Sequence, residues 1–66
     1  MYGHRIAKLR EEKGLTQEEL AAAIGISRAS LSHYESDRRK PNLITLTRLA
    51  DLFQVSVDYI IGRNHT

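Results

Sequence analysis

Residues 16–36 read TQEELAAAIGISRASLSHYES, and this stretch decides the fold. Thr16 and Glu19 have the spacing of a capping box, in which the Thr oxygen accepts a backbone N–H and the Glu side chain reaches back. Gly25 stands where a helix commonly ends in a left-handed residue, and Ser27 is a preferred cap for the start of the next helix. The stretch therefore predicts two helices joined by a turn of a few residues, which is the spacing of a helix-turn-helix unit.

One helix is predicted before this unit. Ile6 and Leu9 lie three residues apart in a segment of good helix formers. The segment ends near Lys13, because Gly14 interrupts the helical pattern.

Two more helices are predicted after the unit. Asn42 is suited to cap a fourth helix, and Ser56 to cap a short fifth helix that Gly62 ends. The apolar residues of the fourth helix are expected on one stripe facing the core: Leu43, Leu46, Leu49, Ala50 and Phe53. Because β-branched residues never alternate as in a strand, the sequence predicts an all-α fold of five helices.

Length and composition limit the remaining possibilities. The chain has 66 residues, the size of one small domain, so we predict a single domain over residues 1–66. It contains no Cys, which fits a reducing cytosol. Its histidines, His4, His33 and His65, lie too far apart to share a metal on one helical turn, and we predict no metal or cofactor. With no signal peptide and no apolar run near the roughly 20 residues of a membrane helix, we expect a cytoplasmic protein without membrane contact.

Positive charge is concentrated in one place. The net charge is only +2, but Arg38, Arg39 and Lys40 are consecutive and follow the helix-turn-helix stretch after one residue, Asp37. Such a cluster favours a polyanionic partner, although a short basic run is also common on ordinary solvated surface.

The second helix of the unit has a polar face of mostly small side chains. At 100° per residue, an arc of roughly 140° contains Arg28, Ala29, Ser32, His33 and Ser36. Leu31 and Tyr34 point the other way, toward the core. The arc is polar, short and almost free of acidic groups, so it can approach a surface closely and offer hydrogen bonds. These properties predict a helix that enters the DNA major groove, which is wide enough to admit one helix.

Five segments carry a family resemblance. They are residues 16–21 (TQEELA), 25–27 (GIS), 31–35 (LSHYE), 39–41 (RKP) and 52–62 (LFQVSVDYIIG). Together and in this order they resemble the Xre/Cro/CI-type helix-turn-helix family of phage and bacterial transcriptional repressors. The resemblance implies a compact, lambda-repressor-like five-helix domain that binds double-stranded DNA in a sequence-specific manner. Repression is the simplest mechanism that it implies, with activation as the alternative.

The resemblance also assigns roles to residues. It places base reading at Arg28, Ala29 and His33, with Ser32 beside them. We expect phosphate contacts from a second set: Gln17, Ser27, Ser36, Arg38, Arg39, Lys40 and Asn42. It further implies an ion pair between Arg10 and Glu35, which we assign to the fold rather than to DNA.

Alternatives remain for the base-reading residues. Arg28 is expected to contact guanine O6 and N7, with a phosphate contact as the alternative. His33 has three candidate roles, namely a base edge, a phosphate or packing beside Arg28. Ala29 is either a methyl group against thymine or a plain helix former.

The sequence departs from the family at one point. Many relatives have Asn-Gly where this chain has Ser36 and Asp37. Asp37 places a negative charge near the expected phosphates. We expect it either to pair with the nearby arginines or to cap a backbone group.

The sequence also bears on two other classes of function. Ser32, His33 and Asp37 invite a catalytic triad, but neighbouring residues on a helix point in different directions, so an enzyme is not predicted. An interaction module on the same fold, such as an antitoxin, is the stronger alternative. It draws on apolar residues that exceed the needs of a short last helix: Val55, Val57, Ile60 and Ile61.

The same four residues are candidates for a homodimer seam or for the docking of a second domain. One small domain binds a specific site weakly, so we predict a symmetric dimer on a pseudo-palindromic operator. Its half-sites would be about one helical turn, roughly 34 Å, apart. No small-molecule ligand is implied.

Overall fold

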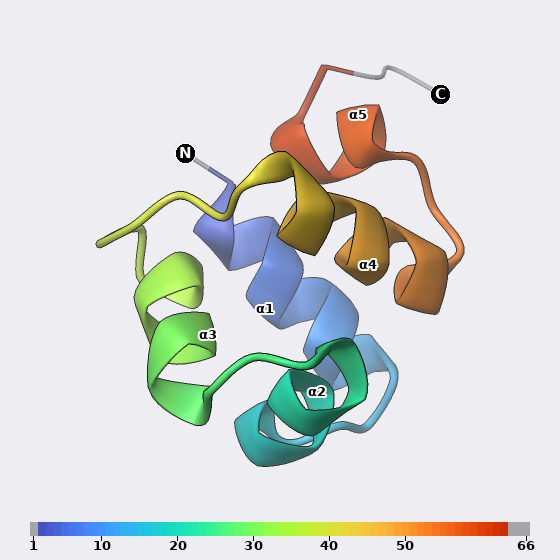
Figure 1. Cartoon of the computed structure of the whole chain (residues 1–66). Coiled ribbons are helices and arrows are strands. Elements are labelled where there is room, and N and C mark those ends of the chain that lie inside the picture. Colours follow the sequence, from blue (N-terminus) through green and yellow to red (C-terminus); the bar gives the residue numbers. More distant parts are fainter. Residues whose placement is uncertain (1, 64–66) are drawn as a thin grey trace.

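The computed structural model describes residues 2–63, and these residues form five helices (Figure 1). The helices are α1 (Gly3–Glu12), α2 (Gln17–Ile24), α3 (Arg28–Glu35), α4 (Leu43–Phe53) and α5 (Val57–Ile61). The predicted all-α architecture with five helices is thus confirmed. His65 lies outside the described residues. Over the described range, every helix is too short or too polar to cross a membrane.

Four helices begin at the caps that the sequence predicts. In the capping box of α2, Thr16 Oγ1 accepts from Glu19 N at 3.0 Å, and Glu19 Oε1 accepts from Thr16 N at 2.8 Å. The other three helices each start with a side-chain oxygen that accepts a backbone N–H of the first turn, and the capping residues are Ser27, Asn42 and Ser56. Capping is decided by neighbours within three residues, which explains why the sequence locates these starts.

The helix ends are less uniform. Gly25 ends α2 in the left-handed region with φ of 79°, and Ile26 N donates back to Ala21 O at 3.0 Å, as in a Schellman motif. Gln54 ends α4 in the same region, with φ of 57°. A left-handed Gln is not predicted by the sequence, because glycine is the usual residue at this position.

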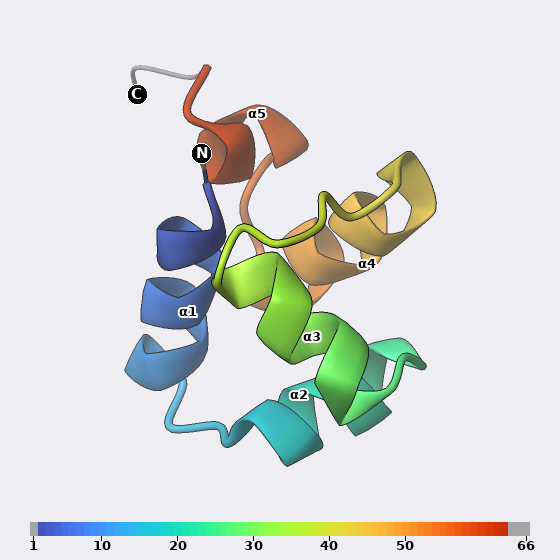
Figure 2. The ribbon, with the colours of Figure 1, turned by 90° about the vertical axis from the view of Figure 1, so that its left-hand side faces the viewer.

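All five helices contribute to one apolar core. Its buried members are Ile6, Leu20, Ala21, Ile24, Leu31, Leu46, Leu49, Ala50, Phe53 and Ile60. The helix-turn-helix pair packs against the remaining helices mainly through α1 and α4, since α1 contacts α3 and α4 contacts α2. Figure 2 shows that α3 lies on the outside of the bundle, where no other helix covers its outward side.

The predicted stripe of α4 is wrong at its first residue. Leu46, Leu49, Ala50 and Phe53 are buried, but Leu43 is 70% exposed. Leu43 stands at the edge of the stripe and in the first turn, which extends beyond the other helices in Figure 2. The next residue, Ile44, is also 65% exposed. The start of α4 therefore presents two neighbouring apolar side chains to solvent.

The predicted dimer seam at the end of the chain is also wrong in part. Ile60 is fully buried, so it cannot contribute to a surface. Val55, Val57 and Ile61 are half-buried and pack against the core of their own chain. The short α5 covers one side of the core, and these four apolar residues mostly pack there.

Candidate nucleic-acid interface

The outward face of α3 gathers the four residues predicted to read bases. Arg28 and Ala29 are exposed, and Ser32 and His33, one turn further along, are half-buried. On the opposite side, Leu31 is the buried residue that anchors α3 to the core. The helix is thus attached along one side, while its other side is free to approach a partner.

Gln17, at the start of α2, contacts side chains from both ends of α3. Gln17 Oε1 accepts a long hydrogen bond of 3.4 Å from Arg28 Nη1, and Gln17 Nε2 donates to Glu35 Oε1 at 2.9 Å. Gln17, expected at a phosphate, therefore adjoins Arg28, expected at a base. The first backbone N–H groups of α2 carry the positive end of the helix dipole, which favours an anion at this end.

An ion pair fixes α3 from behind. Arg10 Nε and Nη2 donate to the two carboxylate oxygens of Glu35, at 2.7 and 3.2 Å. Both side chains are largely removed from solvent, with 14% of Arg10 and 6% of Glu35 exposed. Arg10 Nη1 also donates to Leu15 O at 2.8 Å. The hydrogen bond that Arg10 donates to Glu35 raises the pKa of Arg10, so this guanidinium stays charged and joins α1, α3 and the segment that leads into α2.

Residues 36–42 form a loop between α3 and α4, which we call the basic loop. In Figure 1 it extends to the left of the molecule, away from the helices. It exposes most of the residues expected at phosphates: Ser36, Arg38, Arg39, Lys40 and Asn42. The three basic side chains make no ion pair within residues 2–63, where both recorded pairs involve Arg10. Three cations without carboxylate partners are suited to an external polyanion.

Two of the expected phosphate ligands cap helices with their side chains. Ser27 Oγ accepts from Ser30 N at 3.0 Å and donates to Ser30 Oγ at 2.9 Å, so its hydroxyl is engaged in capping α3. Asn42 Oδ1 accepts from Thr45 N at 2.8 Å to cap α4. The Asn42 amide nitrogen makes no hydrogen bond within the described chain, and it can still donate to a phosphate.

Asp37 resolves the alternatives that the sequence leaves open. Its Oδ1 accepts a hydrogen bond of 2.9 Å from Gly3 N, so it caps a backbone group and does not pair with the arginines. The two residues are 34 positions apart in the sequence, so no local sequence pattern predicts their contact. Gly3 was missed by sequence reasoning for the same reason.

A second missed residue supports the end of α2. Arg48 Nη1 donates to Ile24 O at 3.2 Å, at the negative end of the α2 dipole. Arg48 belongs to α4, so its role depends on how α2 and α4 pack and could not be inferred from sequence spacing.

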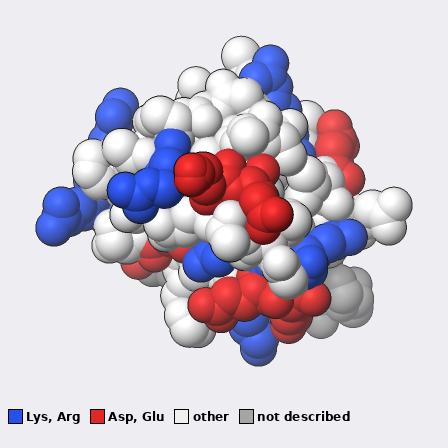
Figure 3. Space-filling model, turned by 90° about the horizontal axis from the view of Figure 1, so that it is seen from below, with Lys and Arg blue, Asp and Glu red and all other residues white. Residues whose placement is uncertain are grey.

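Charge is unevenly distributed over the surface. Figure 3 views the molecule from below and shows Lys and Arg side chains at the left, on the side where Figure 1 places the basic loop, and others at the top, the right and the bottom. Asp and Glu side chains occupy the middle and the lower part of the same view. At the left of this view, the basic side chains extend up to the acidic side chains in the middle.

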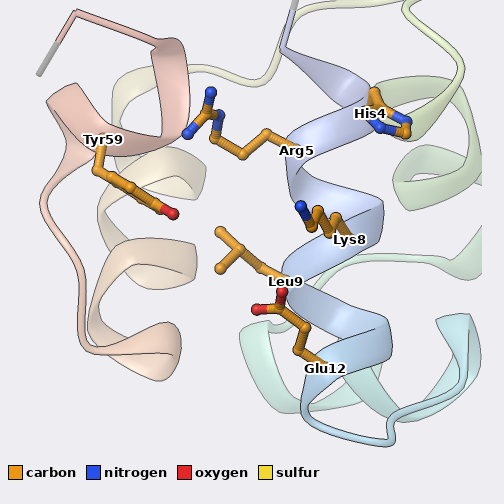
Figure 4. A pocket seen from close by; sticks show the side chains of 6 residues that line it. All are labelled: His4, Arg5, Lys8, Leu9, Glu12 and Tyr59. Atoms are coloured by element: carbon orange, nitrogen blue, oxygen red, sulfur yellow. The ribbon is translucent and has the colours of Figure 1, made fainter. Parts of the chain in front are cut away.

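The geometry does not assemble a catalytic triad. Asp37 Oδ1 accepts from Gly3 N, and within residues 2–63 no hydrogen bond joins the side chains of Ser32, His33 and Asp37. Elsewhere, a groove of about 170 Å³ lies between α1 and α5 (Figure 4). It is lined by His4, Arg5, Lys8, Leu9, Glu12 and Tyr59, none of which belongs to the face of α3. Arg5 stacks on the Tyr59 ring there, with its guanidinium carbon 4.9 Å from the ring centre.

Fold and site together define a helix-turn-helix domain, and the comparisons agree. The Helix-turn-helix family (HTH_3) matches residues 6–60, and the chain belongs to this family. It is 48% identical over 62 residues to the uncharacterized HTH-type transcriptional regulator YobD of Bacillus subtilis (strain 168), covering 94% of this chain and 55% of that protein. It is 50% identical over 56 residues to the uncharacterized HTH-type transcriptional regulator y4dJ of Sinorhizobium fredii (strain NBRC 101917 / NGR234), covering 85% and 73%.

Solved structures show the same fold. The P22 c2 repressor protein, in complex with synthetic operator 9T in the presence of Tl⁺, superposes with a TM-score of 0.90 at 28% identity, covering 97% of each chain. SinR, the master regulator for biofilm formation, in complex with DNA, superposes with a TM-score of 0.85 at 32% identity. That match covers 92% of this chain and 98% of the SinR chain. The resemblance to phage and bacterial repressors is therefore confirmed, and the relatives are transcriptional regulators rather than enzymes. The chain spans about half the length of several curated relatives that it matches.

Proposed function

We propose that this chain binds a double-stranded DNA operator in the cytoplasm and represses transcription by inserting α3 into the major groove. The observation that carries the proposal is the outward face of α3, which no other helix covers and which adjoins Gln17 and the basic loop. The P22 c2 repressor and SinR, whose structures include DNA, give independent support.

Base reading falls to the exposed side chains of α3. Arg28 presents a guanidinium whose recorded hydrogen bond, to Gln17, is 3.4 Å long and therefore weak. It can turn to guanine O6 and N7 with little loss. Ala29 and Ser32 are small enough to let the helix approach the base edges, and His33 adds a hydrogen-bonding ring one turn further on.

Phosphate contacts would come from both sides of α3. Gln17 stands at the positive end of α2 on one side, and the basic loop follows α3 on the other. Contacts on both flanks would fix the register of the helix in the groove without reading sequence.

Dimerisation is proposed through the start of α4. A pseudo-palindromic operator requires a two-fold symmetric pair, and two apolar side chains, Leu43 and Ile44, are exposed immediately after Asn42. We propose this contact in place of the one predicted at residues 55–61, because Ile60 is buried. An interaction-only module such as an antitoxin is less well supported, because the apolar residues that suggested it are largely packed into the core.

The proposal is tested by selecting bound sequences from a random duplex pool at two salt concentrations. An enriched inverted repeat, bound more weakly as salt rises, is expected from several phosphate contacts. Failure to enrich any sequence would contradict the proposal.

Arg28→Ala then tests base reading on the selected operator. We expect the preference at one base position to fall by about 1–3 kcal/mol. Arg63→Ala removes the same charge from an exposed arginine beyond α5 and should leave that preference intact. An equal loss on all sequences would instead make Arg28 a phosphate ligand.

A further inference from the structure

We propose that Asp37 is a positioning residue. It ties the basic loop to the first turn of α1 and thereby sets the distance between the phosphate contacts of the loop and the base contacts of α3. Since the inference rests on the DNA-binding function proposed above, its test must separate the two.

The first turn of α1 has no local cap. The first N–H groups of a helix lack partners within it, and a side-chain oxygen or an acidic residue usually compensates. The side chain of Tyr2, which precedes α1, makes no capping hydrogen bond, and the first turn contains no acidic residue. Asp37, in the loop that follows α3, supplies both the acceptor and the negative charge, at 2.9 Å from Gly3 N.

Close packing holds the same junction. Gly3 is buried, and a Cβ on it would lie 2.3 Å from Tyr34 O and 2.7 Å from Glu35 O. The first turn of α1 therefore touches the backbone at the end of α3 without space for any side chain. The hydrogen bond to Asp37 is made directly beside this contact, so it links the loop to a rigid junction.

The backbone of Asp37 carries a conformational cost. Its φ of 64° lies in the left-handed region, which glycine adopts at a lower conformational free energy than residues with a side chain. Its carboxylate also adds negative charge next to the expected phosphates. Both costs are explained if the carboxylate is needed to anchor the loop.

The chain continues from this anchor into the basic residues. Arg38 N and Arg39 N both donate to His33 O, at 2.9 and 3.3 Å. The loop is thus fixed at its start by two links, one to α3 through the backbone and one to α1 through Asp37. Loss of the second link would leave Arg39 and Lys40 on a more mobile segment while α3 stays in place.

Two substitutions isolate the link. Asp37→Gly removes the acceptor and suits the left-handed backbone, whereas Asp37→Asn keeps an acceptor oxygen and also tolerates this backbone. Both variants lose the same charge, so they differ mainly in whether the bond to Gly3 N can form. Amide exchange at Gly3 should be faster in Asp37→Gly than in Asp37→Asn, which reports the bond without DNA.

DNA binding is then compared on the selected operator and on a shuffled duplex, at a temperature where both variants are folded. We expect Asp37→Gly to bind the operator about three- to tenfold more weakly than Asp37→Asn, as one lost hydrogen bond implies. Binding to the shuffled duplex should agree within about twofold, because non-specific binding follows charge. The salt dependence of operator binding should also be shallower for Asp37→Gly, since ordered phosphate contacts are lost.

Each outcome has one meaning. Equal operator affinities for the two variants, with the natural protein binding the operator specifically, would overturn the positioning role and leave the proposed function intact. A parallel loss on both duplexes would also overturn it, because general destabilisation lowers all binding together. If the natural protein selects no operator, the proposed function fails, and the Gly3 exchange result still reports whether the link exists.

Discussion

The residues that fix α3 in place differ from those that it offers to a partner. Leu31 and Glu35 face inward, and both are removed from solvent. Arg28 and Ala29 face outward and touch little of their own chain. A buried carboxylate such as Glu35 is stable only with its counter-charge, so its partner Arg10 is as important to the helix as the apolar anchor.

This difference predicts a stability effect at the residue scale. Glu35→Gln removes a buried charge that receives hydrogen bonds from Arg10 and Gln17, and we expect it to lower the free energy of unfolding by about 2–4 kcal/mol. Glu11→Gln removes the other carboxylate near Arg10, 3.9 Å away and 70% exposed, and should cost less than about 0.5 kcal/mol. Urea unfolding of both variants measures the difference. Similar midpoints would show that burial does not strengthen the inner pair.

Single residues were predictable where their partners are near in sequence or implied by the resemblance. The capping box of Thr16 follows from a three-residue spacing, and Arg10 and Glu35 follow from the family pattern. The contact between Asp37 and Gly3 follows from neither, because it exists only once α1 and α3 have packed. The roles in base and phosphate contact remain predictions.

At the scale of the helices, the starts are better optimised than the ends. Four of the five described helices begin with a side-chain cap, whereas α4 ends on Gln54 in a left-handed conformation that suits glycine. Ends and starts are both local features, so the sequence located all five helices. It misplaced Leu43, because exposure depends on which elements pack nearby and not on helical spacing alone.

The end of α4 therefore offers a stabilising substitution. Gln54→Gly should raise the free energy of unfolding by about 0.5–1 kcal/mol, because glycine adopts the left-handed backbone without steric cost. Lys13→Gly is the matched control. Lys13 also ends a helix, but with φ of −84°, so glycine relieves nothing there and should destabilise by a similar amount. Thermal unfolding of the pair checks the sign, and destabilisation by Gln54→Gly would contradict the interpretation.

At the scale of the whole molecule, apolar surface remains where the core ends. The core draws on every helix, including the short α5 through Ile60, and leaves Leu43 and Ile44 uncovered. The sequence could suggest that some apolar surface is left for a partner, but not where, because the tertiary packing decides which residues the core consumes.

The proposed dimer follows from this surplus. Replacing Leu43 and Ile44 together by Gln should leave stability within about 0.5 kcal/mol, since both side chains are already exposed. Affinity for the full palindrome should fall by about tenfold, while affinity for an isolated half-site stays the same. Titration of both duplexes distinguishes the two effects. An unchanged affinity for the palindrome would move the dimer contact elsewhere.

The single-sided attachment of α3 has a consequence for how such proteins diverge. Leu31 and Glu35 attach α3 to the rest of the domain. Substitutions at the outward positions therefore disturb little of the packing that holds the domain together, and these positions are Arg28, Ala29, Ser32 and His33. With base reading at these positions as proposed, two copies that arise by gene duplication can acquire different target sites by changing them. Each copy then regulates its own genes while both inherit the same folded scaffold.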